Sequence, residues 1–263
     1  MKREMAFVLL CARLSFHFAL LMRRCLEADD RAIASFAVVG WLGGQLGCDN
    51  PCHQNIIRPL ASEDHTLTQM DERFLPDGRS QRDRMLAGDY YIADDPLLRR
   101  DSNRAANLVA AFNATRGDDQ LGRDRILRKL FASVGEGTII RPPIRCDYGF
   151  QTSIGARSFA NWGLICLDVG KIEIGNDVQL GPNVQLLTAT HPLEPSARLA
   201  KWESSRSIVI GNNVWLGGGV IVCPGVNIGC NTVVGAGAVV TRDLPANVLA
   251  VGNPARIVRP IED

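Results

Sequence analysis

One histidine stands apart in the second half of the chain. His191 is the only histidine after residue 65, and Pro192 follows it. A neutral imidazole can take a proton from an attacking hydroxyl and give it up again, which is general-base chemistry. Acyl transfer from a thioester needs such a base, hydrogen-bond donors for the tetrahedral oxyanion, and a place for each substrate. His191 is therefore our candidate general base for an acyl transfer.

His191 lies where a regular repeat is interrupted. Ile174, Leu180 and Leu186 are six residues apart, and the next aliphatic in step, Ile210, comes twenty-four residues later. That gap is a whole number of six-residue units, but its content does not resemble the repeat. A loop that leaves a regular solenoid commonly carries function. The interruption thus strengthens the interpretation of His191 as a catalytic residue.

The repeat itself predicts the fold. After the interruption the six-residue step runs without a slip through Ile210, Leu216, Val222, Ile228, Val234 and Val240. Residues four places further on keep the same step and are mostly small: Val214, Val220, Val226, Thr232 and Ala238. This periodicity is typical of a hexapeptide β-helix, in which three units of about eighteen residues complete one coil. The fold class we expect is mainly β, a parallel β-helix over residues 134–260.

A short helical segment is expected before the β-helix. Apolar spacing predicts helices over residues 82–91, 101–116 and 123–131, and Asp95-Pro96 marks a helix start. Residues 81–133 therefore form a helical N-terminal segment. Residues 1–80 lack a sustained period, so we interpret them as a poorly ordered extension that the activity does not need. The apolar run 6–22 is broken by polar residues and is short for a membrane span, although a signal-anchor is the alternative interpretation.

Composition excludes several classes of partner. The formal net charge is +1 with 22% charged residues, so no whole-protein field favours nucleic acid or a membrane surface. We interpret Cys146, Cys166, Cys223 and Cys230 as buried free thiols, typical of a reducing cytoplasm. The group Cys48, Cys52 and His53 lacks a fourth ligand, so no metal site is expected.

From residue 82 to residue 260 the chain resembles the maltose, galactoside and nodulation O-acetyltransferases. The most specific features are the Thr-Ala-Thr-His-Pro loop at 188–192, the Asn-Asn-Val-Trp segment at 212–215 and the Gly-Asn-Pro-Ala-Arg terminus at 252–256. Shorter matches lie at residues 85–88, 145–149, 159–161 and 167–168. The resemblance implies a left-handed coil, acetyl-CoA as a co-substrate that is not permanently bound, and a homotrimer with its sites between subunits.

The resemblance also implies roles for individual residues. His191 matches the family's base, and Asp147, Asn161 and Asp168 match positions around the acceptor sugar. Gly218 matches a backbone N–H that faces the thioester carbonyl. The remaining acetyl-CoA-binding matches are Trp215, Ala236, Thr241, Arg242, Arg256 and Arg259.

The acceptor side departs from the family pattern. An acid and an arginine that contact the acceptor in the galactoside enzyme fall on Ala93 and Ser102, and Asp94 or Asp95 is a candidate replacement for the acid. The second acid of a pair near Asp168 falls on Val169, and a proline that often precedes the return to the repeat is Ser207.

We therefore predict transfer of an acetyl group from acetyl-CoA to a sugar hydroxyl. The alternatives are acetyl transfer to serine or an amino sugar, and a non-catalytic trimeric scaffold. A prism-shaped carbonic anhydrase would need several histidines as zinc ligands, and the predicted prism has one.

Overall fold

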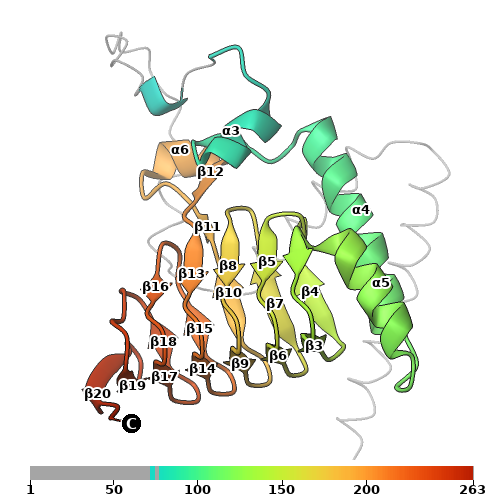
Figure 1. The fold of residues 1–263 in the computed structure, drawn as a ribbon. Coiled ribbons are helices and arrows are strands. Elements are labelled where there is room, and N and C mark those ends of the chain that lie inside the picture. The colour runs from blue at the N-terminus through green and yellow to red at the C-terminus, as the bar shows by residue number, and fades with distance from the viewer. Residues whose placement is uncertain (1–71, 75–76, 263) are drawn as a thin grey trace, which may run out of the picture. The chain divides into compact units, whose positions relative to one another are not determined.

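The computed structural model describes residues 72–74 and 77–262, which fall in one unit of the chain, Leu67–Asp263. The extension expected over residues 1–80 therefore lies mostly outside the described residues, as do Cys48, Cys52 and His53. Within the described part, the predicted architecture is confirmed: a short helical segment precedes a left-handed parallel β-helix (Figure 1).

Short parallel strands build the three faces of the prism in residues 133–260. The first face holds β2 (Ser133–Val134), β5 (Thr152–Ile154), β8 (Ile172–Ile174), β13 (Ile208–Ile210) and β16 (Asn227–Ile228). The second holds β3 (Ile139–Ile140), β6 (Phe159–Ala160), β9 (Gln179–Leu180), β14 (Trp215–Leu216), β17 (Val233–Val234), β19 (Val248–Val251) and β20 (Arg256–Pro260). The third holds β4 (Ile144–Cys146), β7 (Leu164–Leu167), β10 (Gln185–Leu187), β15 (Ile221–Val222) and β18 (Val239–Val240). The last strand, β20, runs antiparallel to β19.

Both rows of the repeat point into the prism. Leu216, Val222 and Val234 are fully buried, and so are Val214 and Val220 from the row of small residues. The small row therefore fills the interior beside the large aliphatics, and glycines occupy tight corners where coils approach closely. At Gly217, for example, a Cβ atom would lie 2.5 Å from the backbone nitrogen of Ala236. Dense stacking of this kind leaves no room for larger side chains at these corners.

Coil length differs between the two halves of the prism. In the C-terminal coils Trp215 pairs with Val233, eighteen residues on, as the repeat predicts. In the earlier coils Ile139 pairs with Phe159, twenty residues on. The two extra residues fall at one corner each time, because eight residues instead of six separate Cys166 from Ile174. We call this edge the expanded corner: residues 147–150, 168–170 and 188–207.

The predicted interruption is the largest expansion of that corner. The chain leaves the prism after β10, forms β11 (Ala189–Thr190), α6 (Pro195–Leu199) and β12 (Trp202–Ser205), and returns at β13. Strand β12 pairs antiparallel with β11 and with β1 (Tyr91–Ile92), which gives a three-stranded sheet in the order β1-β12-β11. The excursion is thus fixed to the helical segment, which lies beside it in Figure 1.

The helical segment differs in its boundaries from the expectation. Helix α3 (Gln81–Ala87) ends earlier than predicted because Gly88 adopts φ +80° and caps it, which frees the next residues to form β1. Helix α4 (Pro96–Asn113) begins at the expected Asp95-Pro96 and not at residue 101, with Asp95 accepting from two backbone N–H groups. Helix α5 (Gln120–Leu130) agrees closely with the prediction. A 3₁₀ turn, Glu72–Phe74, precedes them.

Helices α4 and α5 close the N-terminal end of the prism core. Phe112, Leu127 and Leu130 are buried in the same apolar cluster as the first coils.

No helix of the described residues is long and apolar enough to cross a membrane. The four cysteines after residue 133 are free, but only Cys166 is buried as expected. Cys146 and Cys223 are half-buried, and Cys230 is exposed because it follows β16 at a corner of the prism.

Candidate functional site

The expanded corner is held together by one buried carboxylate. Asp168 is fully buried, and its Oδ1 accepts hydrogen bonds from the backbone N–H groups of Asp147 (3.1 Å) and Tyr148 (3.0 Å). Its Oδ2 accepts from the Thr152 hydroxyl at 3.0 Å. Burial raises the pKa of Asp168 to about 6, although these hydrogen bonds act in the opposite direction. Asp168 thus fixes the backbone that presents Asp147.

Thr188 fixes the backbone of the expanded corner in the next coil. Its buried hydroxyl donates to the Leu167 carbonyl at 2.6 Å and accepts from the Gly170 N–H at 2.8 Å. Three residues later the chain reaches His191, which is exposed just beyond β11. His191 therefore lies at the start of the excursion, directly after a strand that continues from the prism.

Strand pairing places a row of two side chains near the end of β11. Thr190 and Ser204 form the last pair between β11 and β12, and His191 and Glu203 are their neighbours in sequence. Glu203 pairs with Tyr91 of β1. Directly opposite residues project from the same face of a sheet, so Glu203 and Tyr91 share one face.

Asp147 lies close to this row. It is half-buried, and burial together with the nearby Glu203 carboxylate raises its pKa. Burial, Glu203 and the negative charge of Asp147 likewise raise the pKa of Tyr91. The expanded corner therefore gathers a base, two carboxylates and a phenol, a set of groups suited to binding hydroxyl groups beside an imidazole.

A separate groove runs along the second face of the prism. Its volume is about 530 Å³, and among its lining residues are four of the predicted site residues: Asn161, Trp215, Gly218 and Ala236. The Asn161 side-chain oxygen accepts from the Trp162 N–H at 2.9 Å. The walls are mostly apolar, with Leu180, Pro182 and Leu249 among them. Such a groove suits an extended, largely apolar arm.

Gly218 exposes a backbone donor in this groove. Within the described part of the chain, no backbone carbonyl accepts a hydrogen bond from its N–H group. Its carbonyl, by contrast, accepts from the Gly237 N–H at 2.9 Å and is thereby fixed. A preorganised N–H of this kind can stabilise an oxyanion without reorganising.

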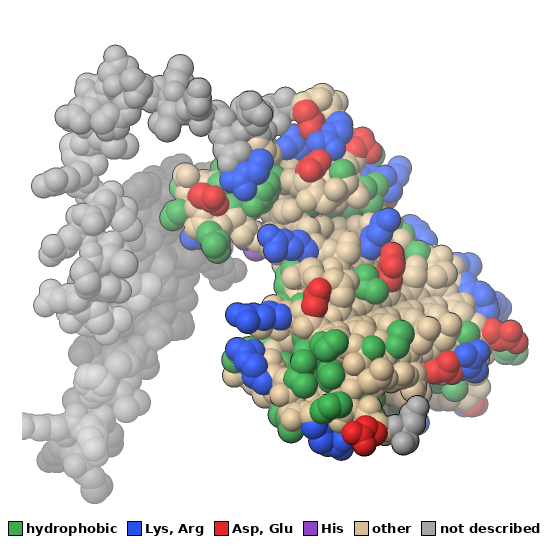
Figure 2. All heavy atoms as spheres, turned by 60° about the vertical axis from the view of Figure 1, so that its left-hand side comes forward, with side chains coloured by type: hydrophobic (Ala, Val, Ile, Leu, Met, Phe, Trp, Pro, Cys, Tyr) green, Lys and Arg blue, Asp and Glu red, His purple; other side chains and the backbone are tan. Residues whose placement is uncertain are grey.

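The predicted phosphate-binding residues lie near the C-terminal end. Thr241 and Arg242 follow β18, and Arg256 and Arg259 lie in β20, all of them exposed. Figure 2 shows apolar side chains gathered on this part of the prism with Lys or Arg side chains at their margin. The exposed apolar residues of this end include Val251, Ile257 and Val258.

The two parts of the candidate site occupy different edges of the prism. Asn161 and Gly218 lie at the corner between the second and third faces, after β6 and β14. His191, Asp147 and Asp168 lie at the corner between the third and first faces. The structure therefore brings together Asp147 with Asp168, and Asn161 with Gly218, on two edges that one whole face separates.

Sequence reasoning missed Glu203. It lies in a polar stretch that carries no repeat, and only its pairing with Tyr91, more than a hundred residues earlier, reveals its place.

Asp95, a suggested replacement for the missing acceptor acid, caps α4, and Asp94 pairs with Arg99. Among residues 77–262, no group of three or more His, Cys, Asp or Glu side chains could hold a metal ion.

Comparison with known proteins places this architecture in a family. A profile described as the maltose acetyltransferase hexapeptide capping motif matches residues 84–135. Nodulation protein L of Rhizobium meliloti (strain 1021) is 45% identical over 179 residues, 68% of this chain and 98% of that protein. A maltose O-acetyltransferase structure from Clostridium difficile 630 is 46% identical with a TM-score of 0.69, covering 70% of this chain and 99% of that one.

A third relative was solved with a bound ligand. A galactoside acetyltransferase in complex with coenzyme A is 36% identical with a TM-score of 0.68, over 70% of this chain and 92% of that one. These similarities cover the helical segment as well as the prism. The chain belongs to the maltose, galactoside and nodulation family of hexapeptide-repeat acetyltransferases, which are acyltransferases.

Proposed function

We propose that the protein transfers the acetyl group of acetyl-CoA to a hydroxyl of a sugar. The observation that carries this proposal is the position of His191 directly after β11, which pairs with the strand that holds Glu203. The Glu203 carboxylate in turn lies close to Asp147. His191 takes the proton of the acceptor hydroxyl, whose oxygen attacks the thioester carbonyl carbon. The Gly218 N–H stabilises the oxyanion that forms, the carbon–sulfur bond breaks, and His191 returns the proton to the CoA sulfur.

The donor is assigned to the groove on the second face. Its apolar walls suit the pantetheine arm, with Trp215 and Ala236 along it and Thr241 beyond. Arg242, Arg256 and Arg259 supply cations for the nucleotide phosphates, since guanidinium groups bind phosphate with paired hydrogen bonds. The coenzyme A complex of the galactoside acetyltransferase supports this assignment.

The acceptor is assigned to the expanded corner. Asp147 and Glu203 offer carboxylate oxygens to sugar hydroxyls, while Asp168 orients the backbone and Asn161 completes the site from the groove side. Because the base and the groove lie on different edges, we propose a homotrimer in which His191 of one subunit faces Gly218 of its neighbour. The free thiols of the prism support a cytoplasmic location.

Substitution of the base tests the proposed reaction. We expect His191→Ala to lower acetyl transfer by about 10²-fold or more, the usual contribution of a general base. The measurement is CoA thiol release with a panel of neutral sugars, amino sugars and serine as acceptors. Acetyl-CoA binding, followed by calorimetry, should persist because His191 lies outside the groove.

Each competing activity has its own outcome. Release of CoA only with serine or only with amino sugars would assign the acceptor to those classes. An absence of turnover with every acceptor, together with intact acetyl-CoA binding, would favour the scaffold. Undiminished turnover by His191→Ala would remove the histidine from the mechanism.

A further inference from the structure

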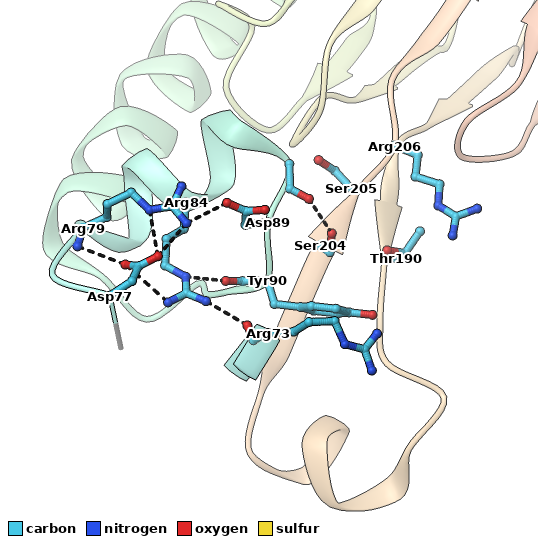
Figure 3. A pocket seen from close by; sticks show the side chains of 11 residues that line it. Arg73, Asp77, Arg79, Arg84, Asp89, Tyr90, Thr190, Ser204, Ser205 and Arg206 are labelled. Atoms are coloured by element: carbon cyan, nitrogen blue, oxygen red, sulfur yellow. Dashed lines mark hydrogen bonds and ion pairs between the residues drawn. The ribbon is translucent and has the colours of Figure 1, made fainter. Parts of the chain in front are cut away.

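The sheet β1-β12-β11 presents different side chains on its two faces. Tyr91 and Glu203 are directly opposed, and their neighbours in sequence include Tyr90 and Ser204. Side chains alternate along a strand, so Tyr90 and Ser204 project to one face, and Tyr91 and Glu203 to the other. Figure 3 shows Tyr90, Ser204 and Thr190 at a cavity of about 510 Å³ on the first face. Tyr91 therefore points away from that cavity.

The Tyr91 side chain is buried, but its hydroxyl is unpaired. Tyr91 is 1% exposed and belongs to an apolar cluster that includes Met85, Tyr148 and Val169. Within the described part of the chain, its hydroxyl is the only buried side-chain polar atom without a hydrogen-bond partner. A buried, unpaired hydroxyl lowers the stability of the fold, and phenylalanine at this position would avoid that cost. The hydroxyl therefore calls for a role outside the stability of the free protein.

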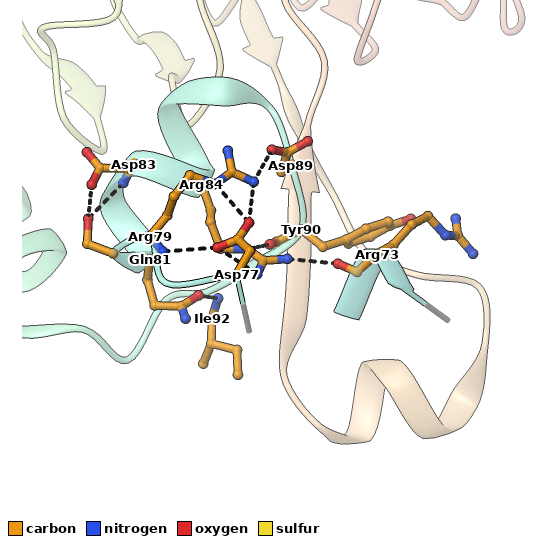
Figure 4. A network of polar contacts seen from close by, with 10 residues as sticks. Arg73, Asp77, Arg79, Gln81, Asp83, Arg84, Asp89, Tyr90 and Ile92 are labelled. Carbon is orange, nitrogen blue, oxygen red and sulfur yellow. Dashed lines mark hydrogen bonds and ion pairs between the residues drawn. The ribbon is translucent and has the colours of Figure 1, made fainter. Parts of the chain in front are cut away.

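Polar contacts from the helical segment hold β1 in place (Figure 4). The Ile92 N–H donates to the Gln81 side-chain oxygen at 2.7 Å. The Arg84 guanidinium donates to the Tyr90 carbonyl, also at 2.7 Å. These bonds fix the residues on either side of Tyr91, and the pairing with β12 fixes Tyr91 itself. The unpaired hydroxyl is therefore held at a fixed position in the sheet that supports the excursion.

Glu203 is the acidic side chain that shares the face of Tyr91. Burial raises the pKa of the Tyr91 phenol, and the nearby Glu203 carboxylate raises it further. Glu203 is half-buried, so its carboxylate can meet the buried phenol on one side and a bound molecule on the other. Among residues 72–74 and 77–262, no lysine or arginine lies within ion-pair distance of Glu203. Tyr91 thus offers a hydrogen-bond donor to a carboxylate that no cation fixes.

We propose that Tyr91 is a positioning residue of the acceptor site, a role that rests on the proposed acetyl transfer. When the acceptor binds, the Tyr91 hydroxyl donates a hydrogen bond to one oxygen of the Glu203 carboxylate. The other oxygen of Glu203 accepts from a hydroxyl of the acceptor. A hydrogen bond to a carboxylate is stronger than one between neutral groups. The hydroxyl that lowers stability in the free protein therefore strengthens acceptor binding.

Two substitutions that each remove one hydroxyl test this role. Tyr91→Phe removes the buried hydroxyl, and Tyr90→Phe removes one from the other face as the matched control. We expect Tyr91→Phe to keep or slightly raise the wild-type Tm, because the lost group was unpaired. It should raise KM for the acceptor about tenfold, the effect of one charge-assisted hydrogen bond, and leave KM for acetyl-CoA unchanged. Tyr90→Phe should match wild type in each measurement.

Thermal unfolding and initial rates of CoA release provide these values. A wild-type acceptor KM in Tyr91→Phe would overturn the proposal. A marked fall in its Tm would also overturn it, because the hydroxyl would then support the fold itself.

A third variant shows whether Tyr91 acts through Glu203. Glu203→Ala removes the carboxylate, so Tyr91→Phe should have no further effect on acceptor KM in that background. Effects that multiply in the double variant would overturn the positioning role. Wild type that releases no CoA with any acceptor would contradict the proposed function, and the positioning role would fall with it. The two failures are distinguishable, because the first requires an active wild type.

Discussion

Asp168 acts on the expanded corner through the backbone. Its carboxylate accepts from two backbone N–H groups and a hydroxyl, yet burial still raises its pKa to about 6. The folded protein therefore binds a proton at a pH where the unfolded chain has released it. Since the unfolded value is near 3.8, this residue makes the fold less stable as pH rises from about 4 to 6.

The substitution Asp168→Asn should remove this pH dependence. The amide is nearly isosteric, and its oxygen can still accept from the Asp147 and Tyr148 N–H groups while its NH₂ donates to Thr152. We expect the wild-type free energy of unfolding to fall by on the order of 2–3 kcal/mol between pH 4 and pH 6 relative to the variant. Urea unfolding of both proteins at the two pH values measures the difference.

The substitution Asp168→Ala, unlike Asp168→Asn, removes the hydrogen-bond acceptor. It leaves two buried N–H groups without an acceptor, so we expect a loss of about 2–4 kcal/mol at pH 6 and a larger loss at pH 4, where the wild-type carboxyl adds its pH-dependent stability. Parallel pH profiles for wild type and Asp168→Asn would show that this carboxyl does not titrate in the window.

For a single residue, the sequence can predict a role when the signal is local, but not when the role depends on a partner far away in the chain. His191 could be chosen from the sequence because it is unique in the prism and interrupts a countable repeat. Glu203 could not, because its significance comes from pairing with Tyr91, which lies in another element. The buried state of Asp168 was also beyond reach, since a corner residue has no period that shows which way it points.

At the scale of elements, the 3₁₀ turn before α3 packs against Tyr90 and against strand β12 of the excursion. The Phe74 ring lies 4.7 Å from the Tyr90 ring centroid and 5.5 Å from that of Trp202. Trp202 is in β12, beside Glu203, and the Arg84 guanidinium lies over the Trp202 ring, 5.4 Å from its centroid. The boundary expected at residue 80 stays a prediction, but Phe74 already contacts Tyr90, which precedes β1, and Trp202 of β12.

Removal of this stack should loosen the excursion. We expect Phe74→Ala to lower the free energy of unfolding by about 1–2 kcal/mol, the effect of losing a half-buried aromatic contact. It should also raise KM for the acceptor, because β12 presents Glu203. Chemical denaturation and initial-rate kinetics measure the two effects.

The control for this substitution is Leu121→Ala on α5, whose side chain is 77% exposed. An exposed site of this kind should change stability by no more than about 0.5 kcal/mol. Phe74→Ala with the stability and KM of that control would show that the turn does not support the excursion.

For the whole molecule, the division of the site between two prism edges has a direct test. Gly218→Leu should block the groove without breaking the fold, because the nearest atoms to a Cβ there, in the Pro182 ring and carbonyl, lie at 3.3–3.4 Å and need to move only slightly. His191→Ala and Gly218→Leu should each be nearly inactive. In an equal mixture of the two chains, random trimers restore roughly a quarter of the sites, since each shared site draws one edge from each neighbour.

The assay is CoA release by the co-refolded mixture compared with each variant refolded alone. Recovery toward that fraction supports a site shared by neighbouring copies. A mixture no more active than its components would mean that base and groove act within one chain, which the separation of the two edges argues against.

The architecture as a whole was more predictable than the site. Six-residue spacing is set by local geometry, so the prism, its buried rows and the excursion could be read by counting. The twenty-residue coils were not expected, because the two extra residues of each coil lie in corners such as 147–150 that break the period. Residue roles carried over from relatives, such as those of Trp215 and Arg242, remain predictions.

The rise of the prism per coil is constant, although the coils change from twenty to eighteen residues. Each coil adds about 4.8 Å along the axis whatever its length, because strand spacing is fixed by backbone hydrogen bonds. In the proposed donor site, the number of coils between Gly218 and the Arg256–Pro260 strand therefore sets the distance from the oxyanion donor to the arginines assigned to the phosphates. Side-chain changes cannot alter that distance, whereas loss or gain of one whole coil would shift it by a full step. Under the proposed assignment, the number of coils matches the site to the length of its donor, and the expanded corner can differ with the acceptor.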